Sequence, residues 1–528
     1  MEVPLLISDF LRRAVKLYGD QEAVVDNGQR LTWAQFGERT DRLANALLAL
    51  GVAKGDRVAL LSPNSHQFLE TLYATAAIGA AAVPINYRLI AADFEYILQH
   101  SGAKVAIVDS DYTGVVDGLR ASVPIQRYVV ARFETDVVPD GWDDYEALLQ
   151  AQPATPPPDP GLVETDLLSI NYTSGTTARP KGVMITHRNA YINAYNAIVH
   201  WRVTQDDREL WTLPMFHANG WGGPYAITGM GGTHVVMRKV DGPAIYQLLQ
   251  DEGITIACMA PAVLATILEL PGKASYDIRT TPRFVVAGAP PPQTFIQRLE
   301  QELGWEFIQI YGLTETSPIL TISEIKPHLA LESQDYYRTK ARAGQEVIGT
   351  DVRVFASDGA EVPWDDESIG EIAARSNVVL EGYWQQPAET ANVIRDGWFF
   401  TGDMATVNKD GYINIVDRAK DVIISGGENI SSLEIEDVLY KHPAVLEAAV
   451  IGVPSEKWGE TPIAVIVPRD GATLTSDEII AHCRDNMAHF KTPSRVEFVQ
   501  TLPRTATGKL KKFELREQYW QGQTKRVN

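Results

Sequence analysis

The sequence predicts an α/β fold with largely parallel sheets, divided between two or more folding units. Short β-branched runs alternate with helix-length amphipathic segments, which is typical of strands joined by helices. The clearest predicted strands are 57–61, 104–108, 233–237 and 283–288. The length of 528 residues exceeds that of one ordinary domain.

The first predicted element is an amphipathic helix at the N-terminus. Residues 1–19 carry Glu2 and Asp9 and lack an uninterrupted apolar core, so they do not form a signal peptide. The most apolar stretch, 68–85, contains Glu70 and is rich in alanine and glycine, which favours a buried helix followed by a strand over a membrane span.

Two segments are candidate boundaries. The run PATPPPDP at 153–160 has too many prolines for a helix or a sheet, and is interpreted as a domain linker or as a surface loop inside one domain. Near Asp417 the charged run DRAKD is followed by apolar residues and then by SGGEN. The sequence therefore predicts a large domain over 1–416 and a small domain over 417–528.

Composition restricts the partners and the compartment. The formal net charge of -20 opposes binding to nucleic acid or to an anionic membrane, because both are polyanions. Cys258 and Cys483 are the only cysteines, which excludes a disulfide framework and favours a reducing compartment, the cytoplasm. We expect both to be packed thiols, and a homodimer stays open.

A loop rich in hydroxyls and glycine lies between two apolar runs at 169–187, SINYTSGTTARPKGVMITH. Its hydroxyls and backbone N–H groups can surround phosphoryl oxygens while Lys181 supplies positive charge. The candidate phosphate contacts are Thr173, Ser174, Gly175, Thr176 and Thr177. A solvated Ser/Thr turn is the alternative. The loop departs from G-x-x-x-x-G-K-[ST], because Pro180 and Gly182 stand at two of its defining positions, which disfavours a kinase or a GTPase.

The same loop resembles the signature of the adenylate-forming superfamily, which includes acyl-CoA synthetases, luciferases and peptide-synthetase adenylation domains. Ala178 stands where that signature has a glycine. Six further segments resemble the family in the same order: 214–221, 287–292, 311–318, 397–403, 417–431 and 503–509. The resemblance implies a large N-terminal domain of stacked, mainly parallel sheets and a small mobile α+β C-terminal domain, with ATP, Mg²⁺ and coenzyme A as cofactors.

The resemblance also implies roles in the nucleotide site. Glu315 is expected to bind magnesium with help from Thr173, a capping glutamate being the alternative. Tyr311 is expected to stack on adenine opposite Gly288, Ala289 and Pro290, and Gly312 and Thr314 belong to the same loop. Asp403 resembles the carboxylate that holds both ribose hydroxyls.

Further roles fall in the small domain. Arg418 and Lys420 stand where the family has a ribose contact and a hinge residue, with the hinge at 417–420. Lys509 resembles the mobile lysine that bridges the carboxylate and the α-phosphate. In a second pose, Ser425, Gly426 and Gly427 resemble the loop beside the pantetheine channel, so a catalytic domain rotation is expected.

The acid is a small molecule whose class is left as two hypotheses. His217, a catalytic candidate, stands where amino-acid-activating relatives carry an aspartate, and no acidic residue occurs between Glu209 and Asp241, which disfavours an amino acid. Six glycines in 217–232 predict an apolar tunnel, and Trp221 beside Gly220 resembles the aromatic gate of fatty-acyl-CoA synthetases. A medium- or long-chain fatty acid is the leading expectation. A short or aromatic acid is the alternative, if side chains block the tunnel.

Three classes of protein compete. A CoA ligase is favoured over an enzyme that loads an acyl carrier protein, because no second module follows Lys509. A catalytically idle nucleotide-binding scaffold is disfavoured, because Lys181, Glu315, Asp403 and Lys509 are all present and binding alone needs no mobile lysine.

Overall fold

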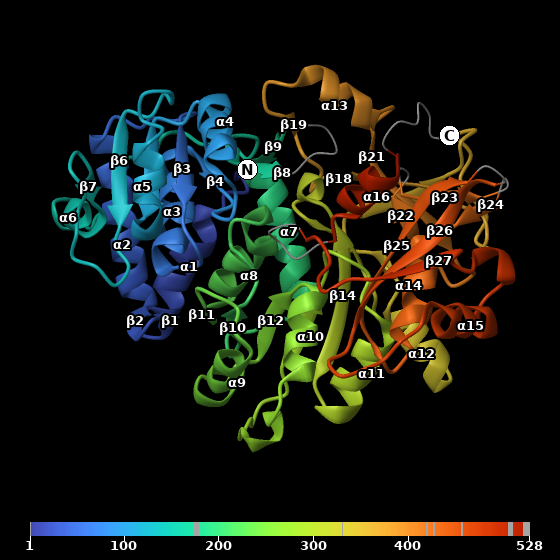
Figure 1. The fold of residues 1–528 in the computed structure, drawn as a ribbon. Coiled ribbons are helices and arrows are strands. Elements are labelled where there is room, and N and C mark those ends of the chain that lie inside the picture. Colours follow the sequence, from blue (N-terminus) through green and yellow to red (C-terminus); the bar gives the residue numbers. More distant parts are fainter. Residues whose placement is uncertain are drawn as a thin grey trace.

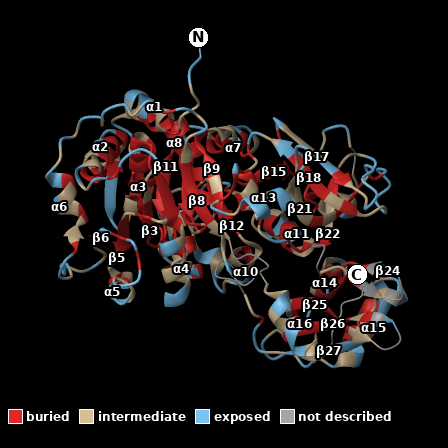
Figure 2. Ribbon diagram, turned by 90° about the horizontal axis from the view of Figure 1, so that it is seen from above, coloured by how far each residue is buried: buried red, intermediate tan, exposed pale blue. Residues whose placement is uncertain are grey.

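The fold was obtained as a computed structural model, which describes residues 2–173, 179–329, 331–418, 421–425, 428–455, 458–504 and 510–520. Within these residues the strands form four sheets. Figure 1 shows their order in space, and Figure 2 shows the buried strands at the centre of the large N-terminal part, with the last sheet standing apart from it.

Two large sheets are mainly parallel, as expected. The first runs in the order β16 (Gln345–Glu346), β15 (Ile319–Ile322), β14 (Glu306–Gly312), β13 (Arg283–Val286), β12 (Ile256–Met259), β10 (Arg208–Trp211), β11 (Thr233–Val236), β1 (Glu22–Asp26) and β2 (Gln29–Thr32). The second runs in the order β19 (Gly382–Tyr383), β9 (Lys181–Thr186), β8 (Leu167–Thr173), β4 (Ala81–Pro84), β3 (Arg57–Leu61), β5 (Val105–Asp109), β6 (Arg127–Ala131) and β7 (Asp143–Asp144).

Helices stack in layers against these sheets. The largest apolar cluster combines α1 (Ser8–Tyr18), α2 (Trp33–Ala49), α3 (His66–Ile78), α7 (His187–His200) and α8 (Gly223–Met230) with strands of both sheets. The outer face of the first sheet packs on α9 (Gly242–Asp251), α10 (Pro261–Glu269) and α11 (Gln293–Glu302). The outer face of the second packs on α4 (Ala91–Ser101) and α5 (Thr113–Asp117).

Two smaller sheets complete the fold. The third contains β17 (Thr350–Phe355), β18 (Gly370–Ser376), β21 (Trp398–Val407) and β20 (Ile394–Arg395), with β22 (Ile413–Arg418) paired to β21. The fourth contains β24 (Glu428–Ile430), β23 (Ile423–Ser425), β26 (Gly459–Pro468), β25 (Val445–Ser455) and β27 (Arg495–Phe498), and packs on α14 (Ser432–Tyr440) and α15 (Ser476–Asn486). The remaining α-helices are α6 (Tyr145–Gln150), α12 (Ser333–Lys340), α13 (Pro387–Val393) and α16 (Lys512–Trp520).

The structure confirms the fold class and the main elements. The four predicted strands appear as β3, β5, β11 and β13, and the apolar stretch forms the buried α3 and β4. The proline-rich run 153–160 is a surface loop between α6 and β8 of the second sheet, the second of its two interpretations. Cys258 and Cys483 are buried free thiols. No described helix combines the length and the hydropathy that crossing a bilayer would need.

Candidate functional site

The phosphate loop lies between two paired strands, β8 and β9. Strands β8 and β9 are antiparallel, and Thr173 lies directly opposite Lys181 at the end of the ladder. The pairing therefore brings one candidate hydroxyl and the candidate cation to the same edge of the second sheet. Ser174, Gly175, Thr176, Thr177 and Ala178 lie outside the described residues.

Lys181 has two partners that sequence reasoning did not single out. Its ammonium forms an ion pair with Glu389 of α13, and it lies 5.0 Å from the centre of the Tyr383 ring, within the range of a cation–π contact. Both partners come from the segment 380–390, which is distant in sequence. This segment offers neither a periodic pattern nor a charged motif, so no local signal points to it.

Tyr383 also contacts Glu315, the candidate magnesium ligand. The phenol donates a 2.9 Å hydrogen bond to Glu315 Oε1, and the backbone N–H of Leu380 donates to the Glu315 carbonyl at 2.7 Å. Burial, together with the neighbouring carboxylate, raises the pKa of Tyr383, so the phenol keeps its proton at neutral pH and remains a donor. The structure thus brings Lys181 and Glu315 together around one tyrosine.

Tyr311 and Asp403, two further nucleotide candidates, contact each other directly. The Tyr311 phenol donates a 2.8 Å hydrogen bond to Asp403 Oδ2, and both residues are buried. Asp403 on β21 pairs in register with Arg418, the last residue of β22. The ribose and adenine candidates therefore lie together, and the bond fixes the carboxylate of Asp403.

The remaining nucleotide candidates lie at the carboxyl ends of neighbouring strands. Gly288, Ala289 and Pro290 follow β13, which is parallel to β14, and Tyr311 and Gly312 end β14. A Cβ at Gly312 would lie 1.6 Å from the carbonyl oxygen of Pro318, so this position requires glycine. Thr314 is buried at the start of the short helix η4 (Thr314–Thr316), which also holds Glu315. The carboxyl edge of a parallel sheet is where α/β folds bind ligands.

The acyl candidates form an unusual backbone run. His217 precedes five residues, Ala218 to Gly222, that all have positive φ, between 46° and 85°. Asn219 holds this run by accepting a 2.9 Å bond from Asn171 and donating a 2.8 Å bond to Ser169, both buried on β8. Left-handed conformations are costly for residues other than glycine, so the surrounding network must maintain them.

Trp221, which belongs to this run, is buried in an apolar cluster. The cluster also contains Leu213, Ala218, Ile310 and Ile319, and Trp221 is 4% exposed. Trp221 therefore lies in a buried apolar region, and its role as a gate for the acyl group stays a prediction.

The glycines of 217–232 do not leave open room, which corrects the expectation on which the tunnel rested. A Cβ at each of the six would lie between 2.1 and 2.9 Å from another protein atom. The atoms that fill these spaces belong to Trp211 for Gly220, Asn193 for Gly222, Glu209 for Gly223, Phe10 for Gly229, Tyr18 for Gly231 and the Asp207 carbonyl for Gly232. Glycine here allows close packing of the loop and α8 against their neighbours.

The C-terminal candidates are described only in part. Arg418 ends β22, and Ser425 ends β23, where it pairs with Gly459 of β26. Lys420, Gly426, Gly427 and Lys509 lie outside the described residues.

A buried ion pair lies at the start of α16, close in sequence to Lys509. The ammonium of Lys512 lies 2.8 Å from Glu436 of α14 and also donates to Ser432. Ser432 in turn donates to Asp417, at the end of the third sheet. The predicted hinge and the element that follows Lys509 are therefore connected through buried polar groups.

Comparison with known proteins gives one family. The model described as "AMP-binding enzyme" matches residues 11–384, and "AMP-binding enzyme C-terminal domain" matches residues 434–509. The chain is 36% identical over 536 aligned residues to the peroxisomal trans-cinnamate:CoA ligase of Petunia hybrida, covering 98% of this chain and 94% of the relative. It is 37% identical to 4-hydroxybutyrate–CoA ligase 2 of Metallosphaera sedula, with the same coverage of both chains.

Solved structures agree. An anthranilate–CoA ligase in complex with anthranoyl-AMP matches with a TM-score of 0.90 and 26% identity, covering 98% of both chains. A Mycobacterium tuberculosis fatty acyl CoA synthetase matches with a TM-score of 0.75 and 35% identity, also covering 98% of both chains.

Proposed function

Because the chain belongs to the AMP-binding enzyme family, in which its relatives are CoA ligases, we propose that it activates a compact carboxylic acid, short-chain or aromatic, and transfers the acyl group to coenzyme A. The enzyme is an acid–thiol ligase that uses ATP, Mg²⁺ and coenzyme A. The carboxylate attacks the α-phosphate of ATP, forming an acyl-adenylate and releasing pyrophosphate. The thiol of coenzyme A then displaces AMP and forms the thioester.

The adenylation step must bring two anions together, so its site has to screen negative charge. In this proposal Lys181 and the hydroxyl loop hold the triphosphate, and Asp403 holds the ribose beside Tyr311. Glu315 and Thr173 hold Mg²⁺, which favours carboxylate and other oxygen ligands and neutralises phosphate charge when bound. The hydrogen bond from Tyr383 to Glu315 is compatible with this role, because it involves only Oε1 of the carboxylate.

Filling of the six glycine positions carries the proposal of a compact acid. A long acyl chain needs a continuous apolar channel, and the loop and α8 are instead packed against Trp211, Asn193 and Glu209. The names of the two curated relatives, which specify cinnamate and 4-hydroxybutyrate, favour the same size class. The likeness to a fatty acyl CoA synthetase supports the competing proposal of a medium- or long-chain fatty acid. The packing around the glycines of 217–232 does not support that proposal.

A panel of acids tests the choice. AMP release is measured with butyrate, 4-hydroxybutyrate, 2-methylpropanoate, cinnamate, benzoate, decanoate and palmitate at saturating ATP and coenzyme A. We expect the highest kcat/KM for a member of the first five. A maximum at decanoate or palmitate would refute the compact-acid proposal and leave the ligase chemistry intact.

The two half-reactions are separated by one lysine. We propose that Lys509 acts only in adenylation, so Lys509→Ala abolishes acid-dependent pyrophosphate release but keeps thioester formation from a supplied acyl-adenylate. Lys511→Ala is the matched control, because Lys511 is a nearby lysine that forms an ion pair with Glu514 of α16. Equal loss of both steps in Lys509→Ala would contradict a domain rotation about 417–420 and the proposed pantetheine contacts of Ser425, Gly426 and Gly427.

Three coarser proposals accompany this function. We propose the domain boundary at 417, and the end of the third sheet near Arg418 supports it. Coenzyme A is retained over a carrier protein because the relatives are named as CoA ligases. For the compartment we retain the cytoplasm, supported by two free thiols, although the Petunia relative is named as peroxisomal.

A further inference from the structure

The ion pair between Lys181 and Glu389 involves a cation that the proposed function assigns to the triphosphate. The Lys181 side chain is 16% exposed, whereas that of Glu389 is 41% exposed. Glu389 therefore approaches the ammonium from the solvent side. A carboxylate at this position presents to Lys181 the same kind of charged oxygen that a phosphate would.

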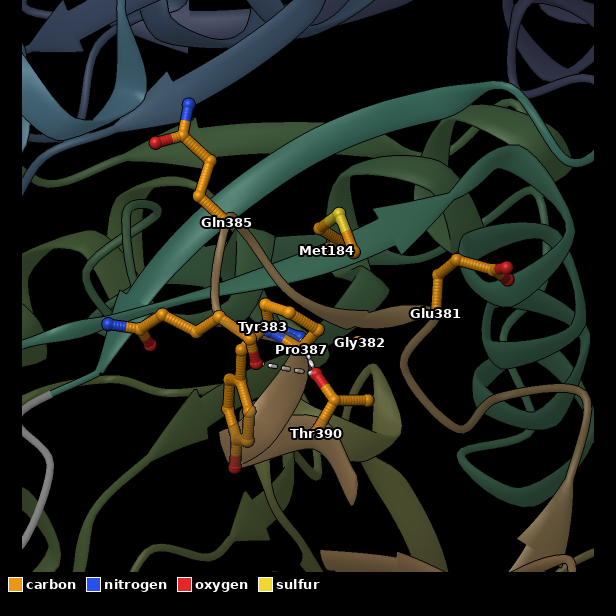
Figure 3. A pocket seen from close by; sticks show the side chains of 8 residues that line it. Met184, Glu381, Gly382, Tyr383, Gln385, Pro387 and Thr390 are labelled. Atoms are coloured by element: carbon orange, nitrogen blue, oxygen red, sulfur yellow. Dashed lines mark hydrogen bonds between the residues drawn. The ribbon is translucent and has the colours of Figure 1, made fainter. Parts of the chain in front are cut away.

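Glu389 is not needed to hold its own segment in place. Thr390 anchors the segment, because its hydroxyl accepts a 2.9 Å bond from the Tyr383 N–H and donates a 3.1 Å bond to the Gln386 carbonyl (Figure 3). Strand β19 pairs with β9, and the Trp384 N–H donates to the Gly182 carbonyl at 2.7 Å. The frame around Lys181 is thus built by backbone and Thr390 contacts.

Lys181 has a second contact besides Glu389. The Tyr383 ring faces its ammonium, and this ring is fixed by the hydrogen bond to Glu315. The described residues lining the adjacent cavity, of about 340 Å³, include no lysine or arginine that could take Glu389 instead. Glu389 can therefore swing toward solvent while Lys181 stays beside Tyr383.

We propose that Glu389 is an internal counter-ion that competes with the triphosphate for Lys181. The carboxylate neutralises Lys181 in the empty enzyme, is displaced when ATP binds, and returns when pyrophosphate leaves. By offering Lys181 an alternative anion, it lowers the affinity for ATP and for pyrophosphate together and favours product release. The proposal rests on the assignment of Lys181 to the triphosphate under the proposed function.

The test uses Glu389→Gln, which keeps the size and removes the charge. Binding of Mg²⁺–ATP and of inorganic pyrophosphate is measured by calorimetry on the full-length protein without acid or coenzyme A. We expect affinity for both to rise by up to about fivefold, the range that a partly exposed ion pair allows. Inhibition of turnover by pyrophosphate should become stronger, while KM for the acid stays unchanged.

Glu381→Gln is the matched control. Glu381 is an exposed glutamate that lines the same cavity, and its side chain extends away from Tyr383 (Figure 3). It changes the net charge equally at a nearby place, so a shift shared by both variants would mean a general electrostatic effect and would overturn the proposal. Glu389→Asp has a shorter side chain that keeps the charge, so its affinity for Mg²⁺–ATP and for pyrophosphate should lie between those of wild type and Glu389→Gln.

Unchanged or weaker pyrophosphate binding in a folded Glu389→Gln protein would also overturn the proposal. Its failure is distinct from failure of the proposed function, because pyrophosphate binding requires no acid. Lys181→Met supplies the remaining check: if it leaves pyrophosphate binding intact, the assignment of Lys181 is wrong and the competition cannot exist.

Discussion

Glu209 is a fully buried carboxyl whose replacement should stabilise the protein in a pH-dependent way. It lies on β10, has no exposed surface, and neither oxygen meets an N–H or O–H donor in the described part of the chain. Its surroundings are the Cys258 thiol and the backbone of Gly223. Burial raises the pKa of Glu209 from 4.5 to about 8.

The direction of the pH dependence follows from the pH at which the folded and the unfolded protein each release the Glu209 proton. Above pH 4.5 the unfolded carboxyl releases its proton, whereas the folded carboxyl keeps it until about pH 8. The contribution of Glu209 to stability is therefore fully present below pH 4.5 and is lost as the pH rises toward 8. At pH 7 the loss amounts to about 3 kcal/mol, from 1.4 kcal/mol per unit of pKa difference.

The assay compares wild type with Glu209→Gln by scanning calorimetry at pH 5.5, 6.5 and 7.5. Gln keeps the volume and does not titrate, so we expect the Tm of the variant to exceed that of wild type by an amount that grows with pH. Glu70→Gln is the opposite control: Glu70 is equally buried but accepts from Arg39 at 2.6 Å and Tyr145 at 2.7 Å, so its variant should melt lower at every pH. A Tm difference for Glu209→Gln that is independent of pH would contradict the raised pKa of Glu209.

Buried contacts elsewhere in the chain lead to further expected outcomes. Lys512→Met leaves Glu436 in the small domain without its cation and should lower the free energy of unfolding by about 3–5 kcal/mol. We expect faster hydrogen exchange in α14 and α16 but not in the first two sheets. Unchanged exchange would contradict this prediction. Gly312→Ala should abolish folding or activity, because its Cβ would lie 1.6 Å from a backbone carbonyl oxygen. Gly114→Ala in α5 is the control: apart from its own helix and chain neighbours, no atom lies within 4 Å of the added Cβ, so activity should be unchanged and Tm should not fall. Asn219→Ala removes two buried hydrogen bonds and should lower the free energy of unfolding by about 2–3 kcal/mol. It should also raise KM for the acid. An unchanged KM would mean that the run 218–222 does not shape the acid site.

Strands and the family motifs were predictable because their signal is local. Runs such as 57–61 and 283–288 alternate with helices, and this pattern alone predicts β3 and β13. The sequence predicts one nucleotide site for Tyr311 and Asp403, since both lie in segments that resemble the family. Their direct hydrogen bond was not predictable, because it joins residues 92 positions apart in sequence.

Contacts made by tertiary packing could not be predicted. Tyr383 and Glu389 reach Lys181 only because a strand of two residues, β19, adds to the edge of β9. The fate of the six glycines depends on which neighbours fill their space, and Trp211, Asn193 and Phe10 come from three different elements. A sequence shows that a side chain is missing at such positions, but not what takes its place.

The left-handed run at 218–222 has a mechanical consequence. Asn171, which hydrogen-bonds to this run, is two residues before Thr173 on β8. The loop proposed to shape the acid site and the loop proposed to bind the triphosphate are therefore both attached to the same strand. An acid of the wrong shape that displaces the run 218–222 would also displace β8 and, with it, Thr173. We therefore expect ill-fitting acids to be rejected through slow adenylation, with kcat falling more than binding weakens.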